Sequence, residues 1–410
     1  MIQWWYHEIG VPGGTKGRLT VRKLNAEKLA KLLENRMAED LGDGRIGGAG
    51  LCVMQDGKEI YKNYFGKKNQ AAQIPMGEVA EGDKVIFRLA SMTKPITAVA
   101  VLIQVSRGLI GLDDPISKWL PEFAEPEIGV LDENRRVVRT GKAKTALTPR
   151  LLLNHTSGLG SMEVGDVQFA AMTSRDKQDI DHVLACYKDF ALAFEPATAQ
   201  YYSPIAAFDL LAKVVELTSG MTYDKFLKEN IFDPCGMVDT AFAPTSEQWS
   251  RMITMHGRRE VDGKGESMDS PVVEGCVFGD FPVTWFSGGA GLAATLPDYV
   301  KFAEMLARGG VTADGVRILP EALVKEMSRV QVSESVMPPP QQWGLAVRVI
   351  SGDCHMPRGC FGWSGAYGSH FWVDPENNVT AVYMKNSSYD GGAGAVSSVH
   401  FEEDVYASAE

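Results

Sequence analysis

The chain has 410 residues, 45% of them hydrophobic, so it can bury a large core as one composite unit or as two or three domains. Its formal net charge is −11 and it has no long run of lysine and arginine, which argues against a nucleic-acid or anionic-membrane surface. The longest apolar stretch is far shorter than the ~20 residues that span a bilayer. We therefore expect no membrane span and a small-molecule substrate.

The first residues and the cysteines indicate the compartment. Residues 1–14 lack a basic start followed by an apolar core and a small-residue cleavage site, so we expect a cytoplasmic protein, although an unrecognised export route stays open. Thinly spread cysteines favour free thiols over a disulfide scaffold. Cys354, His355 and Cys360 lie close together, but no C-x-x-C or H-E-x-x-H pattern supports a metal site. We expect neither a metal nor a cofactor.

The N-terminal part predicts a helix followed by a hairpin. Residues 25–39 place apolar side chains at helical spacing between charged ones, which is typical of an amphipathic helix. Residues 48–66 contain two β-prone runs around Asp56-Gly57, a strong short-range signal for two antiparallel strands.

The segment 88–103, RLASMTKPITAVAVLI, places Ser91 and Lys94 three residues apart at the head of an apolar run. In a helix that begins near Ser91, these two side chains project from the same face. Pro95 fits the first turn, where backbone N–H groups have no partner within the helix. The run that follows is apolar nearly all round, which predicts a helix buried in a core.

This spacing suggests an activated serine nucleophile. A serine hydroxyl needs a neighbouring base, and an amine is a base only when it is neutral. Holding Lys94 neutral at pH 7 means lowering its pKa by about 3.4 units, or about 4.6 kcal/mol, and burial or nearby positive charge has that effect. The S-x-x-K motif alone is a weak signal. Ser174 and Lys177 have the same spacing in a polar stretch, and we interpret this second copy as chance. Ser91 could also be an ordinary N-cap residue of the helix.

The middle of the chain is largely helical by its hydrophobic period. Residues 207–219 repeat apolar side chains at three and four before Gly220, which predicts a helix that ends there. The segments 127–144 and 268–275 are predicted to be exposed excursions.

Strands return at the end of the chain. The segments 369–373 and 379–384 are strand-like around a turn, and 396–408 fits a closing helix. Strands at both ends of a helical centre predict one sheet assembled from distant segments, with a helical insert on the other side of a cleft.

Four segments in order between Arg88 and Met384 resemble the serine β-lactamase and penicillin-recognising superfamily, namely RLASMTKPIT, GLIGLDDPISKWLPEF, LTPRLLLNHTSGL and FSGGAGLAATLPDYVKFAEML. The resemblance is to the branch that holds class C β-lactamases, D-alanyl-D-alanine peptidases and family VIII carboxylesterases. It implies Ser91 as nucleophile and Lys94 as its base partner.

The resemblance also implies an α/β (α+β) fold of the β-lactamase/transpeptidase type, with an antiparallel sheet flanked by helices. We expect a discontinuous sheet domain from 1–95 and 280–410 and a mainly helical domain from 96–279. The active site would lie in the cleft between them.

The second element of this family is a tyrosine followed, after one residue, by asparagine. Tyr202-Ser203-Pro204 matches it with proline in place of the asparagine, which removes an amide that would help to orient substrate. The resemblance implies that Tyr202 exchanges protons with the nucleophile and the leaving group, a role typically worth about 10²–10⁴ in rate. Tyr201 is the competing assignment for this tyrosine.

His155, in NHTSGL, matches a structural segment of the family, so we expect it to have a structural role.

The third element is Lys-Thr-Gly or His-Thr-Gly in lactamases and peptidases, whereas Trp363-Ser364-Gly365 stands here, as in the esterase branch. We take these three residues as substrate-binding candidates. Tryptophan offers a substrate carboxylate neither positive charge nor a comparable polar contact, which favours a neutral acyl substrate; its ring could line a pocket. The resemblance implies an oxyanion hole made by the backbone N–H groups of Ser91 and Ala366.

We therefore expect a serine hydrolase with an acyl-enzyme mechanism, in the first place a carboxylesterase on small acyl esters. A β-lactamase or D-alanyl-D-alanine carboxypeptidase would use the same acylation on another ester or amide substrate. An alternative of another class is a binding or scaffold protein that has kept the fold and lost turnover, as Pro204 and Trp363 would allow. No G-x-S-x-G occurs, which disfavours an α/β-hydrolase. The oligomeric state is left open.

Overall fold

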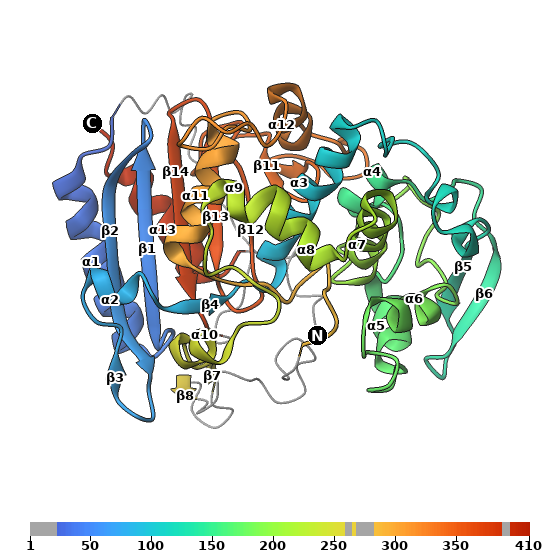
Figure 1. The fold of residues 1–410 in the computed structure, drawn as a ribbon, viewed down its shortest axis with the longest axis horizontal. Helices are drawn as coiled ribbons and strands as arrows, with labels where there is room; N and C mark the ends of the chain where they lie inside the picture. The colour runs from blue at the N-terminus through green and yellow to red at the C-terminus, as the bar shows by residue number, and fades with distance from the viewer. Residues whose placement is uncertain (1–22, 259–264, 268–282, 388–393) are drawn as a thin grey trace.

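The computed structural model describes residues 23–258, 265–267, 283–387 and 394–410. Its main element is an antiparallel sheet in the order β10-β11-β12-β13-β14-β1-β2-β3, which Figure 1 shows on the left. Both ends of the chain contribute its strands, which confirms the predicted sheet: β1 (Gly48–Gln55), β2 (Lys58–Asn69), β3 (Ile74–Pro75), β10 (Gln341–Trp343), β11 (Arg348–Ile350), β12 (Phe361–Ser364), β13 (His370–Asp374) and β14 (Val379–Lys385).

Helices cover the sheet and fill most of the middle of the chain. They are α1 (Ala26–Gly42), α2 (Val79–Gly82), α3 (Thr93–Ser106), α4 (Pro149–Leu153), α5 (Met162–Ala170), α6 (Ile180–Tyr187), α7 (Ala206–Ser219), α8 (Tyr223–Leu227), α9 (Asp233–Cys235), α10 (Ser246–Arg251), α11 (Leu296–Ala307), α12 (Glu321–Ser328) and α13 (Val396–Ala407). Short two-stranded sheets pair β4 (Ile86–Arg88) with β9 (Ala293–Thr295), β5 (Glu127–Leu131) with β6 (Val137–Lys142), and β7 (His256–Arg258) with β8 (Gly265–Ser267).

Two predicted hairpins are confirmed at the centre of the sheet. Between β1 and β2, Asp56 and Gly57 both have positive φ (52° and 69°), as the favoured two-residue hairpin turn requires. Between β13 and β14, the Asp374 carboxylate accepts hydrogen bonds from the backbone N–H groups of Glu376 (3.1 Å) and Asn377 (3.0 Å). Side chains that suit tight turns therefore set both connections.

The sheet separates two apolar layers because successive side chains of a strand point to opposite faces. Along β1, Leu51 and Val53 pack in a cluster with side chains of α1 and α13. Cys52, between them, belongs to the larger cluster that contains side chains of α3, α7 and α11. The predicted closing helix α13 thus covers the face opposite α11.

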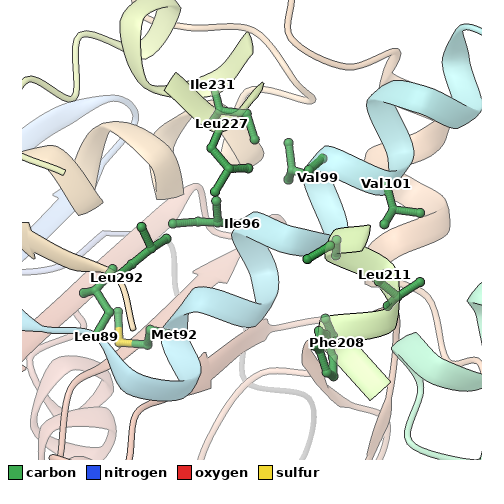
Figure 2. Close-up of a cluster of buried hydrophobic side chains, with 14 of the residues drawn as sticks. Leu89, Met92, Ile96, Val99, Val101, Phe208, Leu211, Leu227, Ile231 and Leu292 are labelled. Atoms are coloured by element: carbon green, nitrogen blue, oxygen red, sulfur yellow. The ribbon is translucent and has the colours of Figure 1, made fainter. Parts of the chain in front are cut away.

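Helix α3 passes through the larger core, as predicted. It follows a 3₁₀ turn, Ala90–Met92, and every residue of 93–104 is buried. Figure 2 shows apolar side chains around it, among them Phe208 and Leu211 from α7 and Leu227 from α8. Any polar group in the first turn of α3 is therefore largely removed from water.

The same core joins the sheet to the helical part of the chain. It contains Phe371 and Val382 from the sheet as well as Ile96 and Leu211 from the helices. The division into a discontinuous sheet domain and an inserted helical domain stays a prediction. Within the described ranges, no helix is long and apolar enough to cross a membrane.

The segment 127–144 is largely exposed, as predicted, and forms the β5–β6 hairpin, which the sequence analysis did not identify. The Asp132 carboxylate shapes its turn by accepting from the N–H groups of Asn134 (2.9 Å) and Arg136 (2.8 Å). Val130 and Val138 are half-exposed, so the hairpin does stand out from the core. The many charges hid its β-branched residues. The other predicted excursion, 268–275, lies outside the described residues.

A buried charge cluster supports the sheet beneath β12. Glu402 of α13 is fully buried and contacts Arg348 together with the Nε2 atoms of His355 (2.7 Å) and His370 (2.9 Å). Burial alone would raise the pKa of Glu402, but Arg348 and the histidines hold that pKa well below its usual range. The cluster keeps Glu402 ionised.

Replacing Glu402 with alanine should lower the free energy of unfolding by about 3–5 kcal/mol, because it leaves Arg348 buried without its counter-charge. Urea denaturation followed by circular dichroism measures the change. Glu122→Ala, at an exposed position, is the control and should have little effect. Equal midpoints for the two variants would contradict the role given to the cluster.

Candidate active site

Ser91 lies in the short turn between β4 and α3. The residue before it, Ala90, has a φ of 45°, a left-handed conformation that is uncommon for a residue with a side chain and is found often at functional sites. The turn is tied down because the Met92 carbonyl accepts from the Tyr299 hydroxyl (2.9 Å). Ser91 itself is partly exposed, so a substrate can reach its hydroxyl.

The Lys94 amine lies 3.1 Å from the Ser91 hydroxyl oxygen. It also donates to the backbone carbonyls of Pro204 (2.6 Å) and Gly289 (2.8 Å). Lys94 is fully buried, and this burial lowers its pKa well below the usual range, with Asp209 acting in the opposite direction.

These contacts suit a neutral amine, which has two N–H groups and one lone pair. Carbonyl oxygens only accept hydrogen bonds. A neutral amine would give its two N–H groups to the carbonyls of Pro204 and Gly289 and keep its lone pair for the Ser91 hydroxyl. In this arrangement Lys94 can accept the serine proton.

Tyr202 lies next to Lys94, whereas Tyr201 does not. The Lys94 amine is 4.9 Å from the centre of the Tyr202 ring. Tyr201 is 46% exposed and packs against Phe194, with ring centres 5.8 Å apart. Pro204, which stands in place of the family asparagine, contributes its carbonyl to Lys94 rather than a side chain.

His155 packs against Tyr202 and accepts hydrogen bonds from the residues on either side of it. Its Nδ1 accepts from the Ser203 N–H (3.1 Å), and its carbonyl accepts from the Tyr201 N–H (3.1 Å). Its ring lies 4.5 Å from the Tyr202 ring. Burial, with a smaller contribution from Lys94, lowers the pKa of His155 well below its usual range, so the ring is neutral. These contacts fit the structural role predicted for this histidine.

Trp363 makes a polar contact that we did not expect. Its indole N–H donates to the Tyr202 hydroxyl (3.3 Å), and its ring packs against Trp343 with centres 4.4 Å apart. Ser364, next to it, is 3% exposed, and its hydroxyl contacts His370 Nδ1 (2.7 Å). The Ser364 side chain is thus engaged beneath the sheet, while Trp363 lies partly exposed beside Tyr202.

The end of β12 packs directly on the chain that leads to Ser91. A Cβ added to Gly365 would lie 2.2 Å from the Leu89 carbonyl oxygen, so only glycine fits there. Gly365 begins a turn closed by its N–H to Ser369 (2.7 Å) and by the Gly368 N–H to the Gly365 carbonyl (2.9 Å). Ala366 is exposed in this turn, and neither closing bond uses its N–H.

The other sequence candidates lie in unrelated settings. Ser174 is exposed in a turn, and the Lys177 amine lies over the Phe169 ring at 4.6 Å. Cys354 is a free thiol that contacts the Met356 backbone. The part of the chain that the structure describes contains no group of three or more metal-ligating side chains suited to an ion.

Sequence reasoning missed the two carbonyls on Lys94 and the buried carboxylate of Asp209. The carbonyls belong to the main chain and leave no trace in residue type. Asp209 did leave a signal, because it is a lone charge in the apolar helical run AAFDLLA. Its carboxylate accepts hydrogen bonds from four donors close to Gly289, namely Tyr187, Trp285, Ser287 and Gly288.

Comparisons with known proteins place this chain in a family. The family model named Beta-lactamase matches residues 29–398. Protein Rv1367c of Mycobacterium tuberculosis is 30% identical over 361 residues, which cover 83% of this chain and 86% of that protein. Esterase EstB of Burkholderia gladioli is 28% identical over 412 residues, which cover 95% and 98%.

Solved structures share the fold at lower identity. EstCE1, described as a hydrolase with promiscuous acyltransferase activity, has a TM-score of 0.76 at 22% identity, covering 93% of this chain and 99% of that one. A family VIII carboxylesterase has a TM-score of 0.69 at 18% identity, covering 95% and 100%. These likenesses confirm the predicted fold class. Since the family model spans most of the sequence, the chain belongs to the beta-lactamase family and is a serine hydrolase of the β-lactamase and penicillin-binding-protein superfamily.

Proposed function

We propose that the protein is a carboxylesterase that hydrolyses small, neutral acyl esters through an acyl-enzyme on Ser91. The observation that carries the proposal is the buried Lys94 amine, which is held by two carbonyls and lies 3.1 Å from the Ser91 oxygen. The similarity to proteins named as esterases, including Esterase EstB, supports the choice of substrate class.

In the first half of the proposed reaction, Ser91 Oγ attacks the ester carbonyl carbon and Lys94 takes the hydroxyl proton. The N–H groups of Ser91 and Ala366 stabilise the oxyanion. Tyr202 donates a proton to the departing alkoxide and regains one from Lys94, so the products are an alcohol and an ester on Ser91. In the second half, water attacks the acyl-enzyme and the same groups return the protons, which releases the acid.

The surroundings of Tyr202 favour an apolar acyl or alcohol group over a carboxylate. Trp363 and Trp343 lie beside the tyrosine, and Val332 and Met337 pack with them. Trp363 is partly exposed, and a flat apolar side chain of its kind suits a small-molecule site with few polar anchors. At the position where a lysine or histidine would meet a penicillin or peptide carboxylate, Trp363 instead donates to Tyr202.

The specific activity is tested by comparing kcat/KM for p-nitrophenyl butyrate, nitrocefin and a D-alanyl-D-alanine peptide. We expect the ester to be preferred. Efficient hydrolysis of nitrocefin or of the peptide, with poor ester turnover, would favour a β-lactamase or carboxypeptidase instead. A folded protein that turns over none of the three and is not labelled by fluorophosphonates or penicillins would be a scaffold that has lost activity.

Replacing Tyr202 with phenylalanine should lower kcat by about 10²–10⁴, because it removes a proton-transfer group and keeps the ring. KM and the melting temperature should change little. Tyr201→Phe is the matched control, since its ring lies against Phe194, and should keep wild-type kcat. If Tyr201→Phe were the damaging change, the assignment of Tyr202 would be wrong.

A further inference from the structure

Asp209 is a carboxylate buried in the core next to the proposed catalytic base. It is 0% exposed. Its Oδ1 accepts from the Ser287 hydroxyl (2.5 Å) and the Gly288 N–H (3.0 Å), and its Oδ2 accepts from the Tyr187 hydroxyl (3.2 Å) and the Trp285 indole N–H (3.2 Å). All four of these donors are neutral groups. Such a costly group calls for a specific role.

The turn 287–289 links Asp209 to the first turn of α3. On one side, Asp209 holds Ser287 and Gly288, and the Ser287 oxygen in turn accepts from the Gly289 N–H (3.1 Å). On the other side, the Gly288 carbonyl accepts from the Thr97 hydroxyl (2.6 Å) and the Gly289 carbonyl from the Lys94 amine (2.8 Å). The carboxylate therefore reaches Lys94 through a single tight turn.

Close packing fixes this turn against the other carbonyl that holds Lys94. A Cβ on Gly288 would lie 2.2 Å from the Phe208 carbonyl oxygen, and one on Gly289 would lie 2.8 Å from the Pro204 carbonyl oxygen. The turn thus rests directly on the backbone of 204–208. The two acceptors of Lys94 form one packed unit, and Asp209, at the start of α7, anchors it from behind.

We propose that Asp209 is a positioning residue for Lys94: it fixes the 287–289 turn so that the Gly289 carbonyl stays on the amine and the lone pair faces Ser91. This inference rests on the proposed function of Lys94 as the base. Asp209 itself contacts neither Ser91 nor Lys94 through its side-chain hydrogen bonds, so it acts through the turn.

The negative charge of Asp209 gives a second readout, the titration of Lys94, which the loss of a distant structural carboxylate would not change. The groups that face Lys94 are Tyr202, His155 with its lowered pKa, and Asp209. Burial raises the pKa of Asp209 to about 7, against the effect of its hydrogen bonds. Above that pH Asp209 is ionised and its negative charge raises the pKa of Lys94, so loss of the charge should shift the titration of Lys94 to lower pH.

The test compares Asp209→Asn with Asp374→Asn. An asparagine has one acceptor oxygen, so its amide nitrogen must face either the Gly288 N–H or the Trp285 N–H, and the anchor is broken on one side. Asp374 is equally buried and also accepts from four donors, but it lies at the far end of β13 from the Gly365 turn. It is therefore a matched control for the loss of a buried carboxylate.

For Asp209→Asn we expect the plateau rate of Ser91 labelling by a fluorophosphonate, and kcat for p-nitrophenyl butyrate, to fall by about 10²-fold with little change in KM. The ¹³Cε resonance of Lys94, assigned by its loss in Lys94→Met, should titrate at lower pH. Asp374→Asn should lower the melting temperature and leave both readouts at wild-type values. A folded Asp209→Asn protein with wild-type labelling and an unchanged Lys94 titration would overturn the inference.

The lysine titration does not need turnover, so the two proposals fail separately. Absence of ester hydrolysis in the wild-type protein contradicts the proposed function, whereas an unmoved Lys94 resonance contradicts the role of Asp209. If Asp209→Asn does not fold, Ser287→Ala replaces it, because this variant keeps the carboxylate and breaks its link to the Gly289 N–H. We expect a loss of about tenfold in the plateau rate, and a wild-type rate would again overturn the inference.

Discussion

Replacing Ser91 with alanine should abolish ester hydrolysis, with a loss of about 10⁶ in kcat, the effect expected when a serine hydrolase loses its nucleophile. The change removes one oxygen atom from a partly exposed side chain, so the fold should be unaffected. Hydrolysis of p-nitrophenyl butyrate measures the loss. Mass spectrometry of the wild-type protein after treatment with a fluorophosphonate should place the adduct on Ser91.

The chain provides a matched control for this experiment in Ser174→Ala. Ser174 and Lys177 have the same spacing as Ser91 and Lys94, but Ser174 is exposed in a turn and the Lys177 amine lies over Phe169. This variant should hydrolyse esters at the wild-type rate. Full activity in purified Ser91→Ala, or an adduct mapped to another residue, would refute the proposed nucleophile.

Replacing Lys94 with methionine should lower kcat nearly as far as Ser91→Ala, because the two residues act as one unit. Methionine fills a similar volume, but its thioether sulfur is too weak a base to accept the Ser91 proton. The double variant should lose no more activity than either single variant, and this non-additivity is the measurement that separates a shared step from two independent defects. Turnover by Lys94→Met within tenfold of wild type would mean that another group is the base.

The same assignment fixes the sign of the pH dependence. Lys94 acts only when neutral, and burial holds its pKa well below the usual range. In wild-type protein kcat/KM should therefore fall as the pH drops through the folded-state pKa of Lys94 and reach a plateau above it. Lys94→Met no longer buries an amine, but the carbonyls of Pro204 and Gly289 lose this donor, so the two effects oppose each other and the melting temperature should change little.

The elements predicted best from the sequence are those with local causes. The Asp56-Gly57 turn adopts the backbone that these two residue types allow, and α3 is buried because its sequence is apolar on nearly every side. Ser91 and Lys94 meet because a spacing of three on a helical turn brings side chains together. In each case the information lies within a few residues of the feature.

What the sequence could not show depends on contacts between distant segments. The carbonyls of Pro204 and Gly289 reach Lys94 from positions 110 and 195 residues away, and any residue type has a carbonyl. The indole N–H of Trp363 donates to Tyr202 across a separation of 161 residues. The tryptophan indicated an apolar ring that could line a pocket, but its sequence position did not indicate this hydrogen bond. The β5–β6 hairpin was missed for another reason, because its charged residues outweighed a short run of valines.

Holding the base by main-chain oxygens changes how the site tolerates genetic variation. A side-chain substitution at position 204 leaves its carbonyl in place, so proline can replace the asparagine of the family motif and still accept the hydrogen bond from Lys94. At 288 and 289 the limit is steric, since any side chain would strike the backbone of 204–208. In a saturation screen the two positions that hold the amine would therefore differ: 204 would be permissive, whereas 289, like its neighbour 288, would be restricted to glycine.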